Sequence, residues 1–185
     1  MIRRLCTPLL LAATLLAAGC AGFKLGGDTG GASAAPSAAT LAAAEAQRAG
    51  LATAVADSGA SVLRMPDGQL QINVPSDFSF SSDRTEVRAE GRPVLDNLAT
   101  ALKAPEYLPM RIRIVGYTDS QGADAANDAL SLARANSVRK HLEGKGVAAA
   151  RIEVEGRGAR DPVAPNDKAY GRTLNRRIEI YLREP

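Results

Sequence analysis

The chain has few of the side chains that enzymes use for acid–base or metal chemistry. Its 185 residues include one histidine, two cysteines and no tryptophan. The histidine, His141, lies beside Lys140 in a helix-patterned segment and is interpreted as an exposed helix residue. One histidine with two cysteines near the N-terminus is not a ligand set typical of zinc, and Gly156–Gly158 is not followed by the Lys-Ser or Lys-Thr of a phosphate loop. The sequence therefore favours a protein that is not an enzyme and needs no cofactor.

The first 20 residues have the pattern of a secretory signal. Arg3 and Arg4 precede an apolar run from Leu5 to Ala18, which is too short for a comfortable bilayer span. The run closes on LAAGC, which resembles a bacterial lipobox. This resemblance implies that residues 1–19 are removed and that Cys20 becomes the acylated first residue of a lipoprotein. An uncut signal anchor is the alternative.

Lipidation of Cys20 would place the protein on a membrane surface. Acyl chains on one cysteine provide a stable anchor without a spanning helix. The residue after the cysteine is Ala21, and the absence of Asp there resembles the sorting pattern of outer-membrane lipoproteins. We therefore expect outer-membrane lipid as a partner and a domain that faces the periplasm. Loss of the signal also removes Cys6, so no disulfide is expected within the mature chain.

Overall charge gives no support to nucleic-acid binding. The chain has 23 Lys and Arg against 20 Asp and Glu. Removal of Arg3 and Arg4 with the signal leaves 21 basic residues against those 20 acidic ones. Since the basic excess belongs mostly to the signal, nucleic acid is not an expected partner.

Residues 20–58 differ in composition from the rest of the chain. They are rich in Ala and Gly and have few large apolar side chains, so they are not expected to bury enough surface to offset the entropy of ordering. We predict a tether from Cys20 to a folded domain at residues 59–185. A short helix or a coiled-coil seam is the alternative, because a helical stripe is formed by Leu41, Ala44, Leu51 and Val55.

Alternation of apolar and polar residues predicts strands with one buried face. The alternating segments are Leu70–Val74, Ile112–Ile114, Ile152–Val154 and Ile178–Leu182. The turn residues Pro66, Asp67 and Gly68 predict a hairpin that pairs Ser61–Arg64 with Leu70–Val74.

Helical spacing separates these strands in two places. One helix is predicted from Val94, Leu95, Leu98 and Leu102. Another is predicted over Asp124–Glu143, with its buried stripe formed by Ala126, Leu130, Ala133 and Ser137. The order of elements predicts an α+β fold of two layers, a mixed β-sheet with helices packed on one face.

Two opposite charges flank the turn before the second helix. Asp119 follows the predicted strand at Ile112–Ile114, at a sheet edge of the kind where ligands collect. Arg134 lies seven residues after Asn127, so both point within about 20° of each other on the helix. From these residues alone, Asp119 and Arg134 form either a surface salt bridge or a binding site for a ligand that carries both charges.

The chain from about Phe78 to Leu182 resembles the OmpA-like C-terminal domain, the peptidoglycan-associating module of envelope proteins. The resemblance suggests an outer-membrane lipoprotein of the Pal-like or YiaD-like kind. The residues that carry it are Thr118, Asp119, Gly122, Asn127, Leu130, Ser131, Arg134, Ala135, Val138, Gly146, Val147, Arg151, Gly156, Gly158, Pro162, Asn166, Asn175, Arg176 and Arg177.

The resemblance implies non-covalent binding of diaminopimelate in the stem peptides of peptidoglycan. Asp119 would hold the ammonium group of diaminopimelate, and Arg134 its carboxylate. Further contacts would come from Thr118, Asn127 and Arg176. For Asn175–Arg177 the alternative is a basic strand start that lies in solvent, as such segments commonly do. The chain departs from the pattern at Ser81, where relatives often have Asp or Asn, although Ser81 still offers a hydrogen bond. The alternative is an envelope protein that docks mainly on a periplasmic protein partner.

Cys20→Ser is expected to leave an unprocessed precursor, because the thiol that receives the lipid is lost. Cells grown with radioactive palmitate should label the wild-type protein and not the variant. A wild-type protein without label would rule out the lipid anchor.

Overall fold

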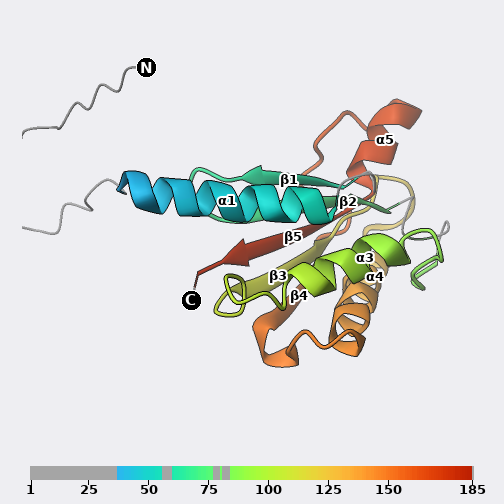
Figure 1. The fold of residues 1–185 in the computed structure, drawn as a ribbon. Coiled ribbons are helices and arrows are strands. Elements are labelled where there is room, and N and C mark those ends of the chain that lie inside the picture. The colour runs from blue at the N-terminus through green and yellow to red at the C-terminus, as the bar shows by residue number, and fades with distance from the viewer. Residues whose placement is uncertain (1–36, 56–59, 77–79, 81–83, 185) are drawn as a thin grey trace, which may run out of the picture. The chain divides into compact units, whose positions relative to one another are not determined.

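The computed structural model describes residues 37–55, 60–76, 80 and 84–184 (Figure 1). The signal segment, Cys20 and Ser81 lie outside these residues. The elements in chain order are α1 (Ala38–Ala54), β1 (Ser61–Arg64), β2 (Leu70–Pro75), α3 (Arg92–Ala101), β3 (Arg111–Gly116), α4 (Asp124–Gly144), the 3-10 turn η1 (Ala149–Arg151), β4 (Ile152–Gly156), α5 (Ala169–Asn175) and β5 (Arg177–Arg183). In this part of the chain, no helix has both the length and the apolar character needed to span a bilayer.

The strands form one mixed sheet in the order β1-β2-β5-β3-β4. The last strand of the chain, β5, lies in the middle and pairs antiparallel with both β2 and β3. β3 and β4 pair in parallel, because α4 carries the chain back between them. The predicted hairpin is confirmed, with Ser61 opposite Asn73 and with Gly68 at φ 86° in the turn.

α1, α3 and α4 cover one face of this sheet, as the sequence predicts, whereas α5 projects beyond its end (Figure 1). Alternate strand residues such as Ile72, Ile114 and Ile180 are fully buried. α3 packs on them through the predicted stripe, with Leu95 and Leu98 also fully buried. Burial of these apolar side chains is the main favourable contribution to folding.

The predicted stripe of α4 is wrong, although the helix has nearly the predicted bounds. Ala126 is exposed, and the other members of that stripe are only partly buried. The buried residues are instead Asn127, Ser131, Arg134, Ala135, Val138 and Leu142. The spacing of apolar residues predicts the wrong buried face of α4, because the first half of that face consists of polar side chains that bond to neighbouring loops.

α1 lies within the segment predicted to be a tether. Leu51 and Val55 are 0% and 1% exposed and belong to the hydrophobic core. The Tyr107 hydroxyl donates a hydrogen bond of 2.6 Å to the Gln47 carbonyl, which fixes the helix near the end of α3. The folded unit therefore begins before residue 59. An alanine-rich helix needs only a narrow seam of larger side chains to dock, which average composition does not reveal.

α5 is an element that the sequence pattern did not predict. It has seven residues, too few for a helical period to stand out. Gly171 permits close packing, since a Cβ there would overlap the Pro165 carbonyl oxygen. Arg172 Nη1 donates to the Asn166 carbonyl at 3.0 Å, so α5 is held firmly against the loop before it.

Leu51→Ala is expected to lower the free energy of unfolding by about 2–4 kcal/mol, because it removes a fully buried side chain from the core. Chemical denaturation of the full chain measures this. Leu41→Ala is the matched control on the same helix, since Leu41 is 45% exposed and its loss should change stability little. Equal stability of both variants would show that α1 does not dock.

Candidate functional site

Three polar residues lie side by side at one end of the sheet. On one side of Arg176 lies Ser76, whose amide donates to the Arg176 carbonyl at 2.9 Å. On the other side lies Thr118, because β3 and β5 pair with Gly116 opposite Ile178, and two further steps along this register bring Thr118 opposite Arg176. Cross-strand neighbours share a face. The row Ser76–Arg176–Thr118 therefore continues the helix-covered face beyond its apolar part.

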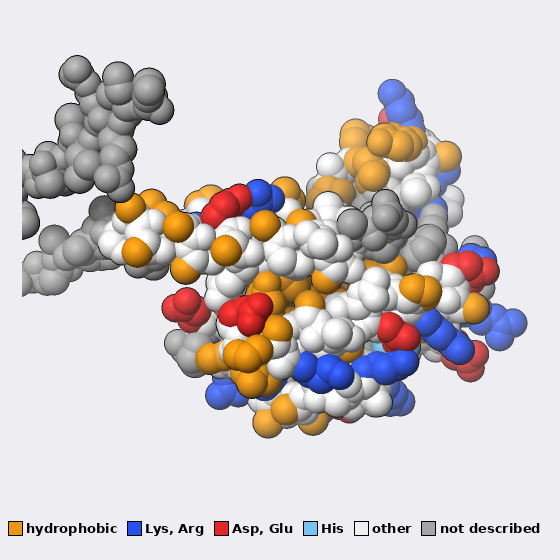
Figure 2. Space-filling view, in the orientation of Figure 1, with side chains coloured by type: hydrophobic (Ala, Val, Ile, Leu, Met, Phe, Trp, Pro, Cys, Tyr) orange, Lys and Arg blue, Asp and Glu red, His pale blue; other side chains and the backbone are white. Residues whose placement is uncertain are grey.

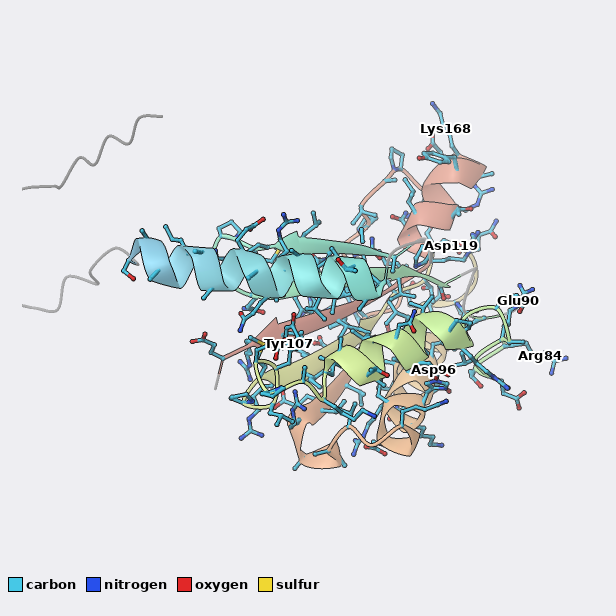
Figure 3. The ribbon with its side chains drawn as sticks, viewed as in Figure 1. Arg84, Glu90, Asp96, Tyr107, Asp119 and Lys168 are labelled. Atoms are coloured by element: carbon cyan, nitrogen blue, oxygen red, sulfur yellow. The ribbon has the colours of Figure 1, made fainter. Side chains whose placement is uncertain are left out.

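Asp119 follows this row directly. Its carboxylate accepts from Arg176 Nη1 at 2.7 Å and from the Gln121 amide at 3.0 Å. Asp119 is 7% exposed, so this ion pair is more protected than a surface salt bridge. Figure 3 shows Asp119 beside the end of α5 that leads into β5. The carboxylate predicted from the sequence is thus fixed in place by a guanidinium group.

α4 supplies two further predicted residues. Asn127 donates through Nδ2 to the Gln121 carbonyl at 3.0 Å, which ties the start of α4 to the turn that contains Asp119. Arg134 is 4% exposed, donates through Nε to the Arg84 carbonyl at 3.0 Å, and lies 5.4 Å from the centre of the Phe80 ring. The aromatic face and the carbonyl both stabilise its positive charge.

Two buried hydroxyl groups in the row have no hydrogen-bond partner. These are Ser76 Oγ and Thr118 Oγ1, and the third such side-chain atom among the described residues is Asn73 Oδ1. Ser76 and Thr118 are 1% and 5% exposed. Buried polar groups in native proteins are nearly always hydrogen-bonded. Two buried hydroxyls without a hydrogen-bond partner, one on each side of Arg176, are therefore typical of a site that receives a polar ligand.

A chain of asparagine contacts supports the turn at Asp119. Asn175 is fully buried and accepts through Oδ1 from the Val163 amide at 2.8 Å and the Ala164 amide at 3.0 Å. Its Nδ2 donates to Asn166 Oδ1 at 2.9 Å, and the same oxygen accepts from the Ser120 amide at 3.3 Å. The last residue of α5 thus holds the loop before that helix and the turn after β3 in one arrangement.

Glycines allow α4 to approach the strands closely. A Cβ at Gly116 would overlap the Ser131 carbonyl oxygen, and one at Gly158 would lie 2.4 Å from Asp128 Oδ1. Gly158 also has φ 54°, a conformation that other residues rarely adopt. Its carbonyl accepts from the Thr118 amide at 2.8 Å. This packing places Asn127 and Arg134 beside the end of β3.

Arg177 belongs to the opposite face of the sheet. It is 3% exposed, pairs with Glu179 at 2.8 Å, and lies 3.7 Å from the centre of the Tyr117 ring. Burial and the neighbouring Glu179 carboxylate raise the pKa of Tyr117 to about 12. The alternative of a solvent-exposed strand start is therefore wrong for Asn175 and Arg177, and Arg176 is the arginine that bonds to Asp119.

The structure gathers five predicted residues at this end of the sheet, namely Thr118, Asp119, Asn127, Arg134 and Arg176. Ser81 lies outside the described residues. Ser76 was missed by the sequence analysis, although continuing the alternation of β2 from Val74 by one step gives the signal. His141 is only partly exposed, contrary to prediction, because its Nε2 lies 2.6 Å from Asp96 Oδ1.

A family model described as the OmpA family matches residues 79–176. The probable lipoprotein YiaD of Escherichia coli K12 is 38% identical over 136 residues, which are 74% of this chain and 61% of that protein. The chain thus spans about three fifths of this relative's length.

Solved structures show the same fold. The cell wall anchor of the type VI secretion system from Pseudomonas aeruginosa is 31% identical, with a TM-score of 0.65 over 73% of this chain and 97% of that one. The peptidoglycan-associated lipoprotein from Burkholderia pseudomallei is 30% identical, with a TM-score of 0.53 over 57% of this chain and 88% of that one. The family model covers more than half of the sequence and includes most of the site. The chain therefore belongs to the OmpA family.

Proposed function

We propose that this protein binds peptidoglycan non-covalently, through the diaminopimelate of its stem peptides. The observation that carries the proposal is the polar site at the end of the sheet, where Asp119, Arg134 and two unpartnered hydroxyls meet. The names of two relatives, a cell wall anchor and a peptidoglycan-associated lipoprotein, describe association with the wall for those proteins and agree with this choice of ligand.

Diaminopimelate has an ammonium and a carboxylate on the end carbon of its side chain. The Asp119 carboxylate already accepts from Arg176 and Gln121, and its remaining lone pairs would receive the ammonium. Arg134 would bind the carboxylate through parallel N–H groups. Arg176 lowers the cost of burying Asp119 and makes the site select a ligand with both charges, because a lone cation would meet Arg176 as a repulsive neighbour.

The unpartnered hydroxyls would complete the contacts. Ser76 and Thr118 lie on either side of Arg176, and each hydroxyl can donate one bond and accept others. A ligand with several oxygens and an ammonium would satisfy both hydroxyls. Because these hydroxyls have no partner in the free protein, a ligand can bond to them without breaking a hydrogen bond within the protein, and each new bond adds to affinity.

We further propose that lipid on Cys20 holds this domain at the inner face of the outer membrane, so that one chain joins membrane and wall. α1 docks on the domain, which leaves residues 21–37 as the spacer between lipid and helix. As a flexible coil these 17 residues would typically reach about 20–25 Å. We propose a binder and not a wall hydrolase, so incubation with purified wall should release no fragments.

Asp119→Asn and Arg134→Lys are expected to reduce co-sedimentation with purified diaminopimelate-type peptidoglycan. Each substitution keeps the size or charge of the side chain and removes one charge-assisted contact, worth about 1.5–3 kcal/mol or roughly a 10- to 100-fold loss of affinity. Arg64→Ala, at the opposite end of the sheet, is the control and should bind normally. Thermal unfolding of each variant checks that the fold is kept.

The same proteins should bind weakly to walls built on lysine, since the lysine side chain ends in an ammonium and lacks the carboxylate for Arg134. Equal binding of the wild type to both kinds of wall, or normal binding by both site variants, would refute the proposed ligand. If binding instead required a protein from envelope extract, the domain would be a docking module for that partner.

Ser76→Ala and Thr118→Val test the unpartnered hydroxyls. Neither hydroxyl bonds to another protein group, so the free energy of unfolding should change by less than about 0.5 kcal/mol or rise. Affinity for a soluble stem peptide, measured by calorimetry, should fall by roughly three- to tenfold for each variant. A loss of stability with unchanged affinity would show that the hydroxyls serve the fold instead.

A further inference from the structure

α5 projects from the domain next to the site. Its C-terminal residue Asn175 is buried, and Arg176 directly after it bonds to Asp119. Figure 3 shows Lys168, just before α5, at the far end of the projection, and Asp119 at the near end. Gly171 and Arg172 pack α5 on the preceding loop, and Asn166 of that loop accepts a hydrogen bond from the Ser120 amide beside Asp119, so direct contacts connect the helix to the site.

The projection carries an apolar surface that the domain does not use. Tyr170 is 76% exposed, Leu174 is 40% exposed, and Val163 in the supporting loop is 59% exposed. Tyr170 and Leu174 are four residues apart and therefore share one side of the helix. Figure 2 shows hydrophobic side chains gathered over α5. The other tyrosines differ, since Tyr107 and Tyr117 are buried and Tyr181 is partly buried.

Most exposed apolar residues in the described part of the chain stand singly, as is normal for a protein surface. Leu41 lies on α1, Leu63 on β1 and Leu108 after α3. The group on α5 and its loop is the one that lies beside the candidate site. A large aromatic ring held at high exposure on a rigid element has the character of a contact surface.

We propose that the side of α5 with Tyr170 and Leu174 binds a sugar ring of the glycan strand to which the bound stem peptide is attached. This inference rests on the proposed function, because the peptide in the site determines where the glycan lies. Pyranose rings present an apolar face of C–H groups, which packs against an aromatic ring as other flat apolar groups do. The occupant is therefore a part of the same polymer.

Distances support this occupant. Tyr170 precedes Arg176 by six positions, so their backbones lie about 9 Å apart along the helix axis. In peptidoglycan, a lactyl group, a dipeptide and the diaminopimelate side chain lie between the sugar and the charges held in the site, a span of more than about 10 Å when extended. A peptide held by Asp119 and Arg134 is thus long enough for its sugar to reach Tyr170.

The test compares one tetrapeptide stem containing diaminopimelate in two forms, attached to its disaccharide or released from it by an amidase. Calorimetry with the full chain should show that wild-type protein binds the disaccharide form roughly three- to tenfold more tightly, as a single aromatic contact would provide. Tyr170→Ala should remove this preference and leave affinity for the free peptide unchanged. Tyr170→Phe keeps the ring and should keep the preference, and Leu108→Ala is an exposed apolar control.

The outcomes separate this inference from the function on which it rests. Asp119→Asn should weaken both ligands equally, and normal binding by that variant would refute the peptide site itself. Equal binding of the two ligands by wild-type protein would overturn the sugar contact alone. A Tyr170→Ala variant that loses affinity equally for both ligands would also overturn it, because Tyr170 would then act on the peptide site.

Discussion

The position of β5 at the centre of the sheet is the constraint on which the rest of the structure depends. Because it pairs with β2 and β3 on its two sides, its first residues bring the ends of both strands together. Successive side chains at the junction of α5 and β5 have different roles. Asn175 holds the loop before α5, Arg176 pairs with Asp119, and Arg177 pairs with Glu179 on the opposite face.

Burying charged side chains at this edge of the sheet costs desolvation energy, and favourable partners for each charge offset that cost. Arg176 neutralises Asp119, while Phe80 and the Arg84 carbonyl stabilise Arg134. Ser76 and Thr118 are left without partners, in contrast to most buried polar groups. Sites that violate the usual rule of polar pairing are commonly functional, which is why this edge of the sheet carries the functional proposal.

The domain also includes more of the chain than its composition suggests. Leu51 and Val55 dock α1 on the core, so part of the alanine-rich segment belongs to the folded domain. α5 projects beside the site, because Arg176, which bonds to Asp119, directly follows the last residue of the helix.

The sequence by itself determined the strands, the hairpin, two of the helices and the charged residues Asp119, Arg134 and Arg176. Periodicity and turn residues are local signals that predict the strands, the hairpin and the helices. The fixed spacings of the family motif single out the charged residues. Only the tertiary structure decided which face of α4 is buried, because Asn127 and Arg134 are polar and their partners come from distant loops. It also decided the docking of Leu51 on the core and the pairing of Asp119 with Arg176, which lie 57 residues apart. Contacts over such separations depend on how strands and helices pack, and no local pattern of residues encodes them.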